Sequence, residues 1–296
     1  MKYFLLIIVL VSCSKKEHKI VYYNSGELLS EYYLENNKLN GIYKEYYRNG
    51  NLKETHNYKN DIRIDSSIYY YKEPQKNIRK IENHISDSIS KLIFYNYKAN
   101  KLIKSEGMSY KDSILIGKWK YYINGILIRV SEYKNIENKT YLNQEWDFNV
   151  NGDTICLSTF FKITKNVKDT LKLNQEFVSI VHVRCPYYKL EDSKILVCLP
   201  NSETKKMNKD FSNIKELGYK CFKDFKTTKI KVSTEDVNTK HLSRITKKFK
   251  TPGEKLVRGI IYEYLVKEKD SIGLDRALEN AHKMYFEIPV FVKDSV

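Results

Sequence analysis

The cysteine nearest the amino terminus, Cys13, stands where a thiol could take part in a processing reaction. It follows the basic residue Lys2, the apolar run 4–11 and the small residue Ser12. A basic start, a short apolar core and a small residue before the cleavage point are typical of a secretory signal. The run is too short to span a bilayer, which needs about 20 apolar residues. We therefore expect export, with residues 1–12 as the signal peptide.

Residues 10–13, Leu-Val-Ser-Cys, resemble the lipobox of bacterial lipoproteins. In that family the cysteine becomes the first residue of the mature chain and carries diacylglycerol on its sulfur. The resemblance implies that Cys13 is lipidated and that residues 13–21 form the tether to the folded chain. Ser14, rather than aspartate, follows the cysteine, which in this family implies the outer membrane, or more broadly the cell envelope. The alternative is an ordinary cleaved signal with an incidental cysteine.

The other cysteines all lie in the second half of the chain: Cys156, Cys185, Cys198 and Cys221. In an exported chain they can form disulfides, and four cysteines allow three pairings. Two apolar segments flank the polar turn 191–193, and a hairpin with this turn places Cys185 opposite Cys198, close to bonding range. We therefore identify these two as a candidate disulfide, although Pro186 weakens the first strand. Cys156 and Cys221 could equally be buried thiols.

No arrangement typical of an enzyme is found in the sequence. It contains neither a Gly-rich phosphate-binding loop nor a Gly-x-Ser-x-Gly elbow. Ser-x-x-Lys occurs at 88–91, 131–134 and 202–205, among other places, as chance allows in a chain rich in Ser and Lys, and its companion Lys-Thr-Gly is absent. The six histidines are separated from one another, and the acidic clusters lie in turn-like stretches. We expect no catalytic residue, no cofactor and no metal.

Tyrosine is unusually frequent, with 25 residues against 12 Phe and 2 Trp. A ring with an apolar body and a polar tip suits a sheet that has one solvent-exposed face. Four of the recurring aromatic residues are candidates for a face on which a sugar or a peptide stacks: Tyr43, Tyr47, Trp119 and Tyr122. The alternative is that alternate members fill the core between hairpins while their neighbours cover its flank.

These aromatic residues lie in segments that repeat along the first half of the chain. The phrase Tyr-x-x-Gly-x-Leu occurs at 23–28 and at 47–52, and a weaker copy is found at 117–127. Short aromatic strands turned by Asn-Gly, at a spacing of roughly two dozen residues, indicate stacked β-hairpins. Residues 72–93 lose the glycines but keep alternating isoleucines, which indicates a diverged repeat or an insertion.

The repeated unit resembles the MORN-type repeat, in the bacterial form known as the YwqK-type antitoxin repeat. Its elements here are Gly-x-aromatic, Tyr, Asn-Gly-x-Leu and a second Tyr followed by Asn, over about residues 22–135. Asp61 stands where the family has glycine, and the second block is one residue shorter than the first. The resemblance implies an array of β-hairpins, which we place at 22–143, and its antitoxin label implies neutralisation of a toxin.

From residue 144 to 296 the pattern changes to short apolar segments separated by polar turns. The candidate strands are 146–148, 155–163, 171–173, 176–183, 195–199, 229–232, 259–266 and 284–292. Strands of this number and length indicate a β-sandwich of immunoglobulin-like kind. We also expect short helices at 210–217 and at 275–282, the second with Asp275 as its N-cap.

The formal net charge is +16. One interpretation is an anionic partner such as nucleic acid, lipid headgroups or an acidic polysaccharide. The other is a lysine-rich composition spread over a solvated surface, since the lysines alternate with Glu and Asp and the densest run, 247–250, is short. We favour the second and expect no nucleic acid partner.

The sequence thus predicts a mostly-β chain, with an N-terminal array of MORN-like β-hairpins followed by an immunoglobulin-like β-sandwich. The expected function is that of a non-catalytic, membrane-anchored lipoprotein of the cell envelope, which acts as a binding or scaffolding module for a protein or a glycan. The membrane is contacted through the lipid on Cys13. The alternatives are an antitoxin- or immunity-type protein and an envelope hydrolase with an unrecognised site.

Overall fold

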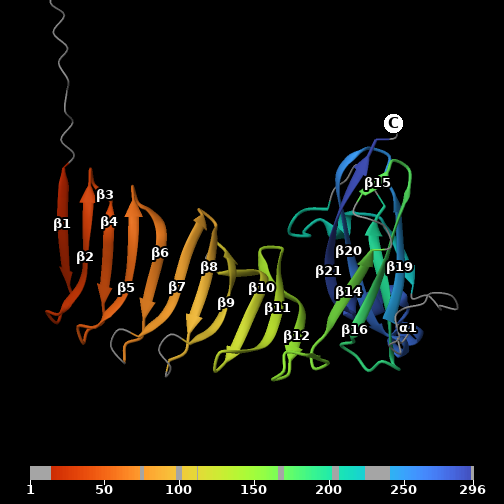
Figure 1. Ribbon diagram of the computed structural model, residues 1–296, viewed down its shortest axis with the longest axis horizontal. Helices are drawn as coiled ribbons and strands as arrows, with labels where there is room; N and C mark the ends of the chain where they lie inside the picture. Colours follow the sequence, from red (N-terminus) through yellow and green to blue (C-terminus); the bar gives the residue numbers. More distant parts are fainter. Residues whose placement is uncertain are drawn as a thin grey trace, which may run out of the picture. The chain divides into compact units, whose positions relative to one another are not determined.

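The computed structural model describes residues 15–73, 77–97, 102–111, 113–165, 170–201, 207–223 and 241–294 (Figure 1). The described chain is mostly β-strand, as the sequence predicts, and nearly all of its strand pairs are antiparallel. It divides into two compact units, Met1–Ser113 and Ile114–Val296, which are treated separately below. Cys13 and the candidate strand 229–232 lie outside the described residues.

The first unit is an antiparallel meander. Its strands are β1 (Lys16–Tyr22), β2 (Leu28–Glu35), β3 (Lys38–Leu39), β4 (Gly41–Tyr46), β5 (Leu52–Lys59), β6 (Ile62–Tyr70), β7 (Ile78–Ser86), β8 (Ile89–Tyr95) and β9 (Ile103–Tyr110). They are hydrogen-bonded in the order β1-β2-β4-β5-β6-β7-β8-β9, with β3 paired to β2. Residues 78–93 form β7 and most of β8, so the segment that lacks glycines is a diverged repeat and not an insertion.

The glycines of the repeated phrase shape the hairpin loops. Gly26 and Gly50 have φ angles of 97° and 81°, a region that glycine adopts without steric cost. Their amides donate to the carbonyls of Tyr23 and Tyr47, each over 2.9 Å. The spacing Tyr-x-x-Gly in the sequence is therefore the signature of one loop conformation that closes successive hairpins.

Each loop tyrosine also ties its repeat to the next one. The three hydroxyls donate to backbone carbonyls: Tyr23 to Tyr46 (2.8 Å), Tyr47 to Tyr70 (3.0 Å) and Tyr71 to Tyr95 (3.0 Å). We call this series the tyrosine ladder. Its third member was not recognised in the sequence, because the loop after Tyr71 is longer and contains no glycine.

The second unit contains a smaller meander and a sandwich. The meander is β10 (Ile114–Ile123), β11 (Ile126–Ile136), β12 (Lys139–Phe148) and β13 (Thr154–Ile155), in that order. The sandwich consists of the sheet β14 (Phe160–Lys165), β16 (Glu176–Cys185), β19 (Leu242–Lys248) and of a five-stranded sheet. The order of the latter is β15 (Thr170–Lys172), β21 (His282–Lys293), β20 (Gly253–Leu265), β17 (Ser193–Pro200), β18 (Tyr219–Lys223).

The two sheets of the sandwich enclose one apolar core. Fully or almost fully buried members come from both sheets: Phe177, Val181, Val183 and Ile245 from one, and Ile195, Val197, Ile261 and Met284 from the other. The β-sandwich expected from the sequence is therefore present. Its immunoglobulin-like topology stays a prediction.

The meander of the second unit is bound to the sandwich. The side chain of Asn143 on β12 donates to the carbonyl of Tyr285 (2.9 Å) and accepts from its amide (2.7 Å). The hydroxyl of Tyr141 donates to the carbonyl of Lys283 over 2.6 Å. The compact units consequently divide at 113/114, whereas the sequence analysis placed its domain boundary at 143/144.

The helical segments differ in detail from the expectation. Residues 210–217 contain only the 3-10 turn η1 (Ile214–Glu216). Two α-helices follow β20, α1 (Val266–Ile272) and α2 (Leu274–Asn280). The N-cap of α2 is Gly273 and no side chain caps it, so the assignment of Asp275 as N-cap was wrong.

The disulfide pairing also differs from the predicted one. Cys185 is bonded to Cys156 and Cys198 to Cys221, with Cα–Cα distances of 5.5 and 4.1 Å. A bond between Cys185 and Cys198 was expected because β16 and β17 were assumed to form a hairpin. They lie in opposite sheets of the sandwich instead, so the turn at 191–193 crosses from one sheet to the other.

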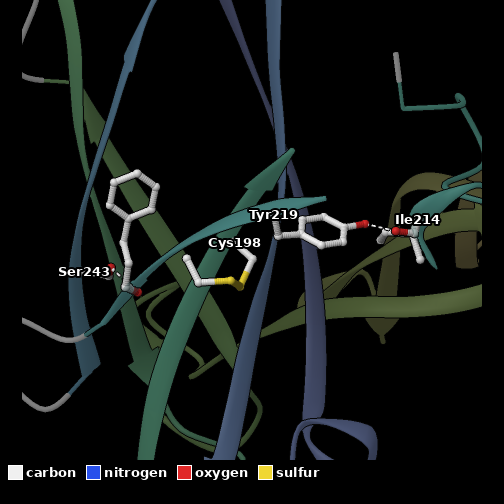
Figure 2. Close-up of a disulfide and its surroundings, with 6 residues drawn as sticks. Cys198, Ile214, Tyr219 and Ser243 are labelled. Carbon is white, nitrogen blue, oxygen red and sulfur yellow. Dashed lines mark hydrogen bonds between the residues drawn. A yellow bond between two sulfur atoms is a disulfide. The ribbon is translucent and has the colours of Figure 1, made fainter. Parts of the chain in front are cut away.

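Figure 2 shows the surroundings of the Cys198–Cys221 bond. The two cysteines are direct cross-strand neighbours on β17 and β18. Ser243 of the opposite sheet donates to the carbonyl of Phe222 over 3.1 Å, and the hydroxyl of Tyr219 donates to the carbonyl of Ile214. The short edge strand β18 is thus held covalently by β17 and by hydrogen bonds on both sides.

Candidate functional site

A cluster of rings on one face of the first unit is the best candidate for a binding site. We call it the aromatic face, and its members are Tyr32, Tyr43, His56, Tyr58 and Tyr69. The register of the strands places them side by side, because Tyr43 pairs directly with His56 and Tyr69 with Glu54. Residues two apart on a strand point to the same side, so Tyr58 joins His56 there.

The rings of the aromatic face contact one another in a continuous series. Their centroids are 5.8 Å apart for Tyr32 and Tyr43, 5.8 Å for Tyr43 and His56, and 5.5 Å for His56 and Tyr69. These distances lie within the range of favourable aromatic pairs. His56 and Tyr69 are buried, while Tyr32, Tyr43 and Tyr58 are partly exposed. The exposed rings therefore rest on a packed base.

Carboxylates and cations alternate with these rings. Glu45 is paired with Lys53, and Glu54 Oε1 lies 3.3 Å from His56 Nε2. Glu82 accepts from Lys80 over 3.0 Å and from the hydroxyl of Tyr69 over 3.1 Å. The face thus offers both ring surfaces and charged groups to a partner.

The environment of these groups shifts their titration. His56 holds the pKa of Glu54 below its ordinary value. Burial raises the pKa of Glu82, but Lys80 and the hydroxyl of Tyr69 outweigh it and the net shift is downward. Burial raises the pKa of the Tyr69 hydroxyl. Both carboxylates are therefore ionised, and the Tyr69 hydroxyl is protonated, at neutral pH.

A chain of hydrogen bonds extends from His56 of the aromatic face across β6 and β7 to β8. His56 Nδ1 lies 2.8 Å from the Oγ of Ser67, which lies 2.9 Å from Nε2 of His84. Nδ1 of His84 is 3.3 Å from the Oγ of Ser90. A connected polar network fixes the orientation of the groups that it contains. The chain of Ser and His side chains therefore fixes the orientation of the His56 ring.

The four aromatic residues predicted from the sequence lie in different places in the structure. Tyr43 belongs to the aromatic face, and Tyr47 belongs to the tyrosine ladder at a loop. Trp119 in the second unit is only 3% exposed and packs edge-on against Tyr133, so it cannot offer a stacking platform. Tyr122, also in the second unit, lies at a register shift near the end of β10 and is partly exposed.

His56, Tyr58 and Tyr69 were not among the residues predicted for a binding face. A signal for two of them was present, because His56 and Tyr58 are two apart on a strand and Tyr58 is the second tyrosine of the repeat. The role of Tyr69 depends on the turn at 60–61, where Asn60 and Asp61 adopt φ angles of 51° and 69°. No local pattern reveals the register that this turn sets.

A buried carboxylate organises one end of the sandwich. Glu263 is fully buried and accepts hydrogen bonds from the amides of Tyr187 and Tyr188, each over 2.9 Å. His282 Nδ1 lies 3.9 Å from it, and the His282 ring stacks on Tyr187 with centroids 4.5 Å apart. Burial raises the pKa of Glu263 and lowers that of His282 to about 4. These contacts hold the segment that connects the two sheets.

The same cluster contains a serine and a histidine but does not have the geometry of a catalytic triad. Ser193 Oγ lies 3.1 Å from His241 Nε2 and 3.3 Å from Glu263 Oε1. In a triad the acid holds the ring nitrogen that faces away from the serine. Here Glu263 approaches the same Nε2, at 4.0 Å, and all three residues have no exposed surface. The arrangement is that of a buried structural network.

Among the residues that the structure describes, no group of three or more His, Cys, Asp or Glu side chains is placed to hold a metal ion. None of the helices in this part of the chain has the length and apolar character needed to cross a membrane.

Comparison with known proteins does not assign the chain to a family. No family model and no curated protein match the chain. Two solved structures that match are a mutant of Salmonella alpha-2-macroglobulin (10% identity, TM-score 0.21) and native E. coli alpha-2-macroglobulin (9% identity, TM-score 0.24). They cover 94% and 95% of this chain, which spans 21% and 22% of theirs. Similarity at this level carries no argument, so the site is interpreted from its own geometry.

Proposed function

We propose that the protein is a non-catalytic lipoprotein of the cell envelope that acts as a binding or scaffolding module. The observation that carries the binding role is the aromatic face. Partly exposed Tyr43 and Tyr58 lie against the buried ring of His56, and Tyr32 lies against Tyr43. Rings that are already ordered lose little conformational entropy when a partner covers them.

The chemistry of the aromatic face suits a protein or a glycan. Tyrosine rings supply apolar contact area together with a hydroxyl, which is why they are enriched at recognition surfaces. Glu45 and Lys53 lie beside the rings and could donate or accept hydrogen bonds. The resemblance of the repeats to the MORN type supports the scaffolding part of the proposal.

Membrane anchoring rests on the sequence around Cys13. A signal-like segment ends in Leu-Val-Ser-Cys at 10–13, and a short polar stretch leads to β1 at Lys16. Acylation of Cys13 would hold the folded units at a membrane of the envelope. This part of the proposal is independent of the aromatic face.

The first experiment compares the intact mass and the membrane association of the wild type and of Cys13→Ala. A chain that is cleaved before Cys13 and carries acyl groups, with loss of membrane association in the variant, supports the anchor. Ser14→Ala serves as the matched control, because it alters the neighbouring residue and keeps the thiol. An unmodified wild-type chain in the soluble fraction would overturn the lipoprotein proposal and bring the immunity-type alternative to the front.

A further inference from the structure

The outermost strand of the first unit, β1, has one edge along which no other strand lies. It begins the hydrogen-bonded order of its sheet, and within the part of the chain that the structure describes it pairs with β2 alone (Figure 1). Its last three residues are apolar and exposed, Ile20 at 49%, Val21 at 36% and Tyr22 at 59%. An open edge with exposed apolar side chains is a template on which a further strand can pair.

The backbone groups of alternate residues of β1 face this open edge. The amide of Asn36 donates to the carbonyl of Lys15 over 3.2 Å, so the backbone of residue 15 faces β2. In an antiparallel ladder, residues bonded to one neighbour alternate with residues whose N–H and C=O point away from it. Lys16, His18 and Ile20 therefore present their amides and carbonyls to the open edge, and their side chains are exposed as well.

The residues between them carry charges of alternating sign. Glu17 lies 2.6 Å from Lys15 and 2.8 Å from Lys19. The two lysine side chains are 80% and 45% exposed, so solvent screens both pairs and they are weak. Lysines on an edge strand commonly discourage pairing with another chain. What lies opposite each charge therefore decides whether a second strand is repelled or accepted.

One register makes β1 complementary to a second copy of itself. When two β1 strands pair antiparallel about His18, Glu17 of each strand lies directly opposite Lys19 of the other. Opposite charges that face each other across two strands stabilise their pairing. In the same register His18 lies opposite His18, and Lys16 lies opposite Ile20. These are the residues whose backbone groups face the open edge, so each such pair can exchange hydrogen bonds.

The neighbouring symmetric registers lack this complementarity. Pairing about Lys19 places the two Lys19 side chains face to face, with Glu17 opposite an apolar Val21. Pairing about Glu17 places the two Glu17 carboxylates face to face and Lys15 opposite Lys19. Like charges directly opposite each other are destabilising. The charge pattern of β1 therefore selects the register centred on His18.

We propose that β1 pairs with β1 of a second copy of this chain in the register centred on His18, which joins the two first units edge to edge. Pairing at an edge supplies main-chain hydrogen bonds, while the side chains set the register. The two-fold symmetry of the pair repeats each contact. This inference goes beyond the proposed lipoprotein function and does not depend on acylation of Cys13.

Cysteine cross-linking in the full-length chain tests the register. In the proposed pair the two copies of residue 18 have Cα atoms about 5.5 Å apart, within the range of a disulfide. His18→Cys should therefore give a covalent dimer on oxidation with copper phenanthroline. Ile20→Cys is the matched control on the same exposed strand, because the two copies of residue 20 would be about 13 Å or more apart. The parent chain shows any dimer that forms through Cys13.

Mixed variants locate the register independently of His18. Residues 16 and 20 lie opposite each other in the proposed pair, whereas two copies of residue 16 do not. Lys16→Cys and Ile20→Cys chains should consequently cross-link when they are mixed and remain monomeric when each is oxidised alone.

An exchange of charges tests the pairing without added cysteines. Glu17→Lys places a lysine opposite Lys19 and should weaken the dimer about tenfold, as measured by analytical ultracentrifugation in detergent solution. Glu17→Lys with Lys19→Glu has the wild-type net charge and again places opposite charges face to face, so it should recover the dimer.

Three results would each overturn the inference: no covalent dimer of His18→Cys, equally efficient cross-linking of Ile20→Cys alone, or cross-linking of His18→Cys to a different protein. An acylated chain that stays monomeric would also overturn it and would leave the lipid anchor intact. The two proposals can therefore fail separately.

Discussion

At the scale of single residues, the surroundings of His282 constrain its charge. Its ring is sandwiched against Tyr187, with Nδ1 3.9 Å from the carboxylate of Glu263. Burial disfavours the protonated imidazole and lowers the pKa of His282 from 6.5 to about 4. The neutral ring is therefore the form that the folded protein stabilises.

This shift predicts a loss of stability in mild acid. A folded-state pKa below the unfolded value means that His282 contributes stability above pH 6.5, and that the contribution is lost as the pH falls from 6.5 to 4. The full effect is about 3 kcal/mol in the free energy of unfolding. Urea unfolding at pH 7 and pH 5 should show about 2 kcal/mol of this effect, and His282→Gln should show a smaller difference between the two pH values.

Glu263 acts in the opposite direction, because burial raises its pKa and protonation then favours the folded state as the pH falls. The comparison with His282→Gln separates the two groups, since Glu263 is retained in both proteins. An unchanged pH dependence in the variant would contradict the assignment to His282.

At the scale of elements, the tyrosine ladder links each repeat to the next one along the chain. The hydroxyl of Tyr47, at the end of β4, reaches the carbonyl of Tyr70 at the end of β6 over 3.0 Å. The bond crosses the intervening β5, so it joins two hairpins and not two neighbouring strands. Strand pairing alone does not supply this connection.

Removing this hydroxyl should loosen the array. Tyr47→Phe keeps the ring and deletes one partly buried hydrogen bond, which costs about 1 kcal/mol in the free energy of unfolding. Chemical unfolding measures the change, and hydrogen exchange should increase near Tyr70. Tyr33→Phe is the control, because the Tyr33 ring is 47% exposed and stacks on His18. Equal effects of the two substitutions would contradict the role of the ladder.

The elements themselves could largely be predicted from the sequence, because the features that determine them involve residues close together in the chain. Gly26 and Gly50 are required by loops of positive φ, and the alternation of residues around Tyr43 is that of a strand. The repeat that contains Tyr71 was recognised less clearly, because its longer loop dispenses with the glycine. Asp275 was assigned as an N-cap from residue type, while the chain places Gly273 there.

At the scale of the whole molecule, both disulfides belong to the second unit. Cys156–Cys185 and Cys198–Cys221 close segments with sequence separations of 29 and 23 residues. Cross-links of this span stabilise a fold by about 3 kcal/mol each, chiefly by restricting the unfolded chain. The first unit, which contains the aromatic face, has no such cross-link among its described residues.

Reduction should therefore affect the two units unequally. With a reductant, hydrogen exchange and proteolysis are expected to increase around β17 and β18, whereas β4 to β8 should keep their protection. Peptide mapping without reductant should recover the pairs Cys156–Cys185 and Cys198–Cys221. Recovery of a Cys185–Cys198 peptide, or equal loss of protection in both units, would contradict this expectation.

The sequence by itself determined the mostly-β character and the hairpin repeats, because steric limits on φ and the alternation of side chains act within a few residues. The tertiary structure decided what depends on distant segments. It buried Trp119, brought Tyr43 and Tyr69 into contact with His56, and placed β12 against β21. It also placed β16 and β17 in opposite sheets, so that Cys185 and Cys198 have different partners. Packing across the chain sets these contacts, and no local pattern encodes them.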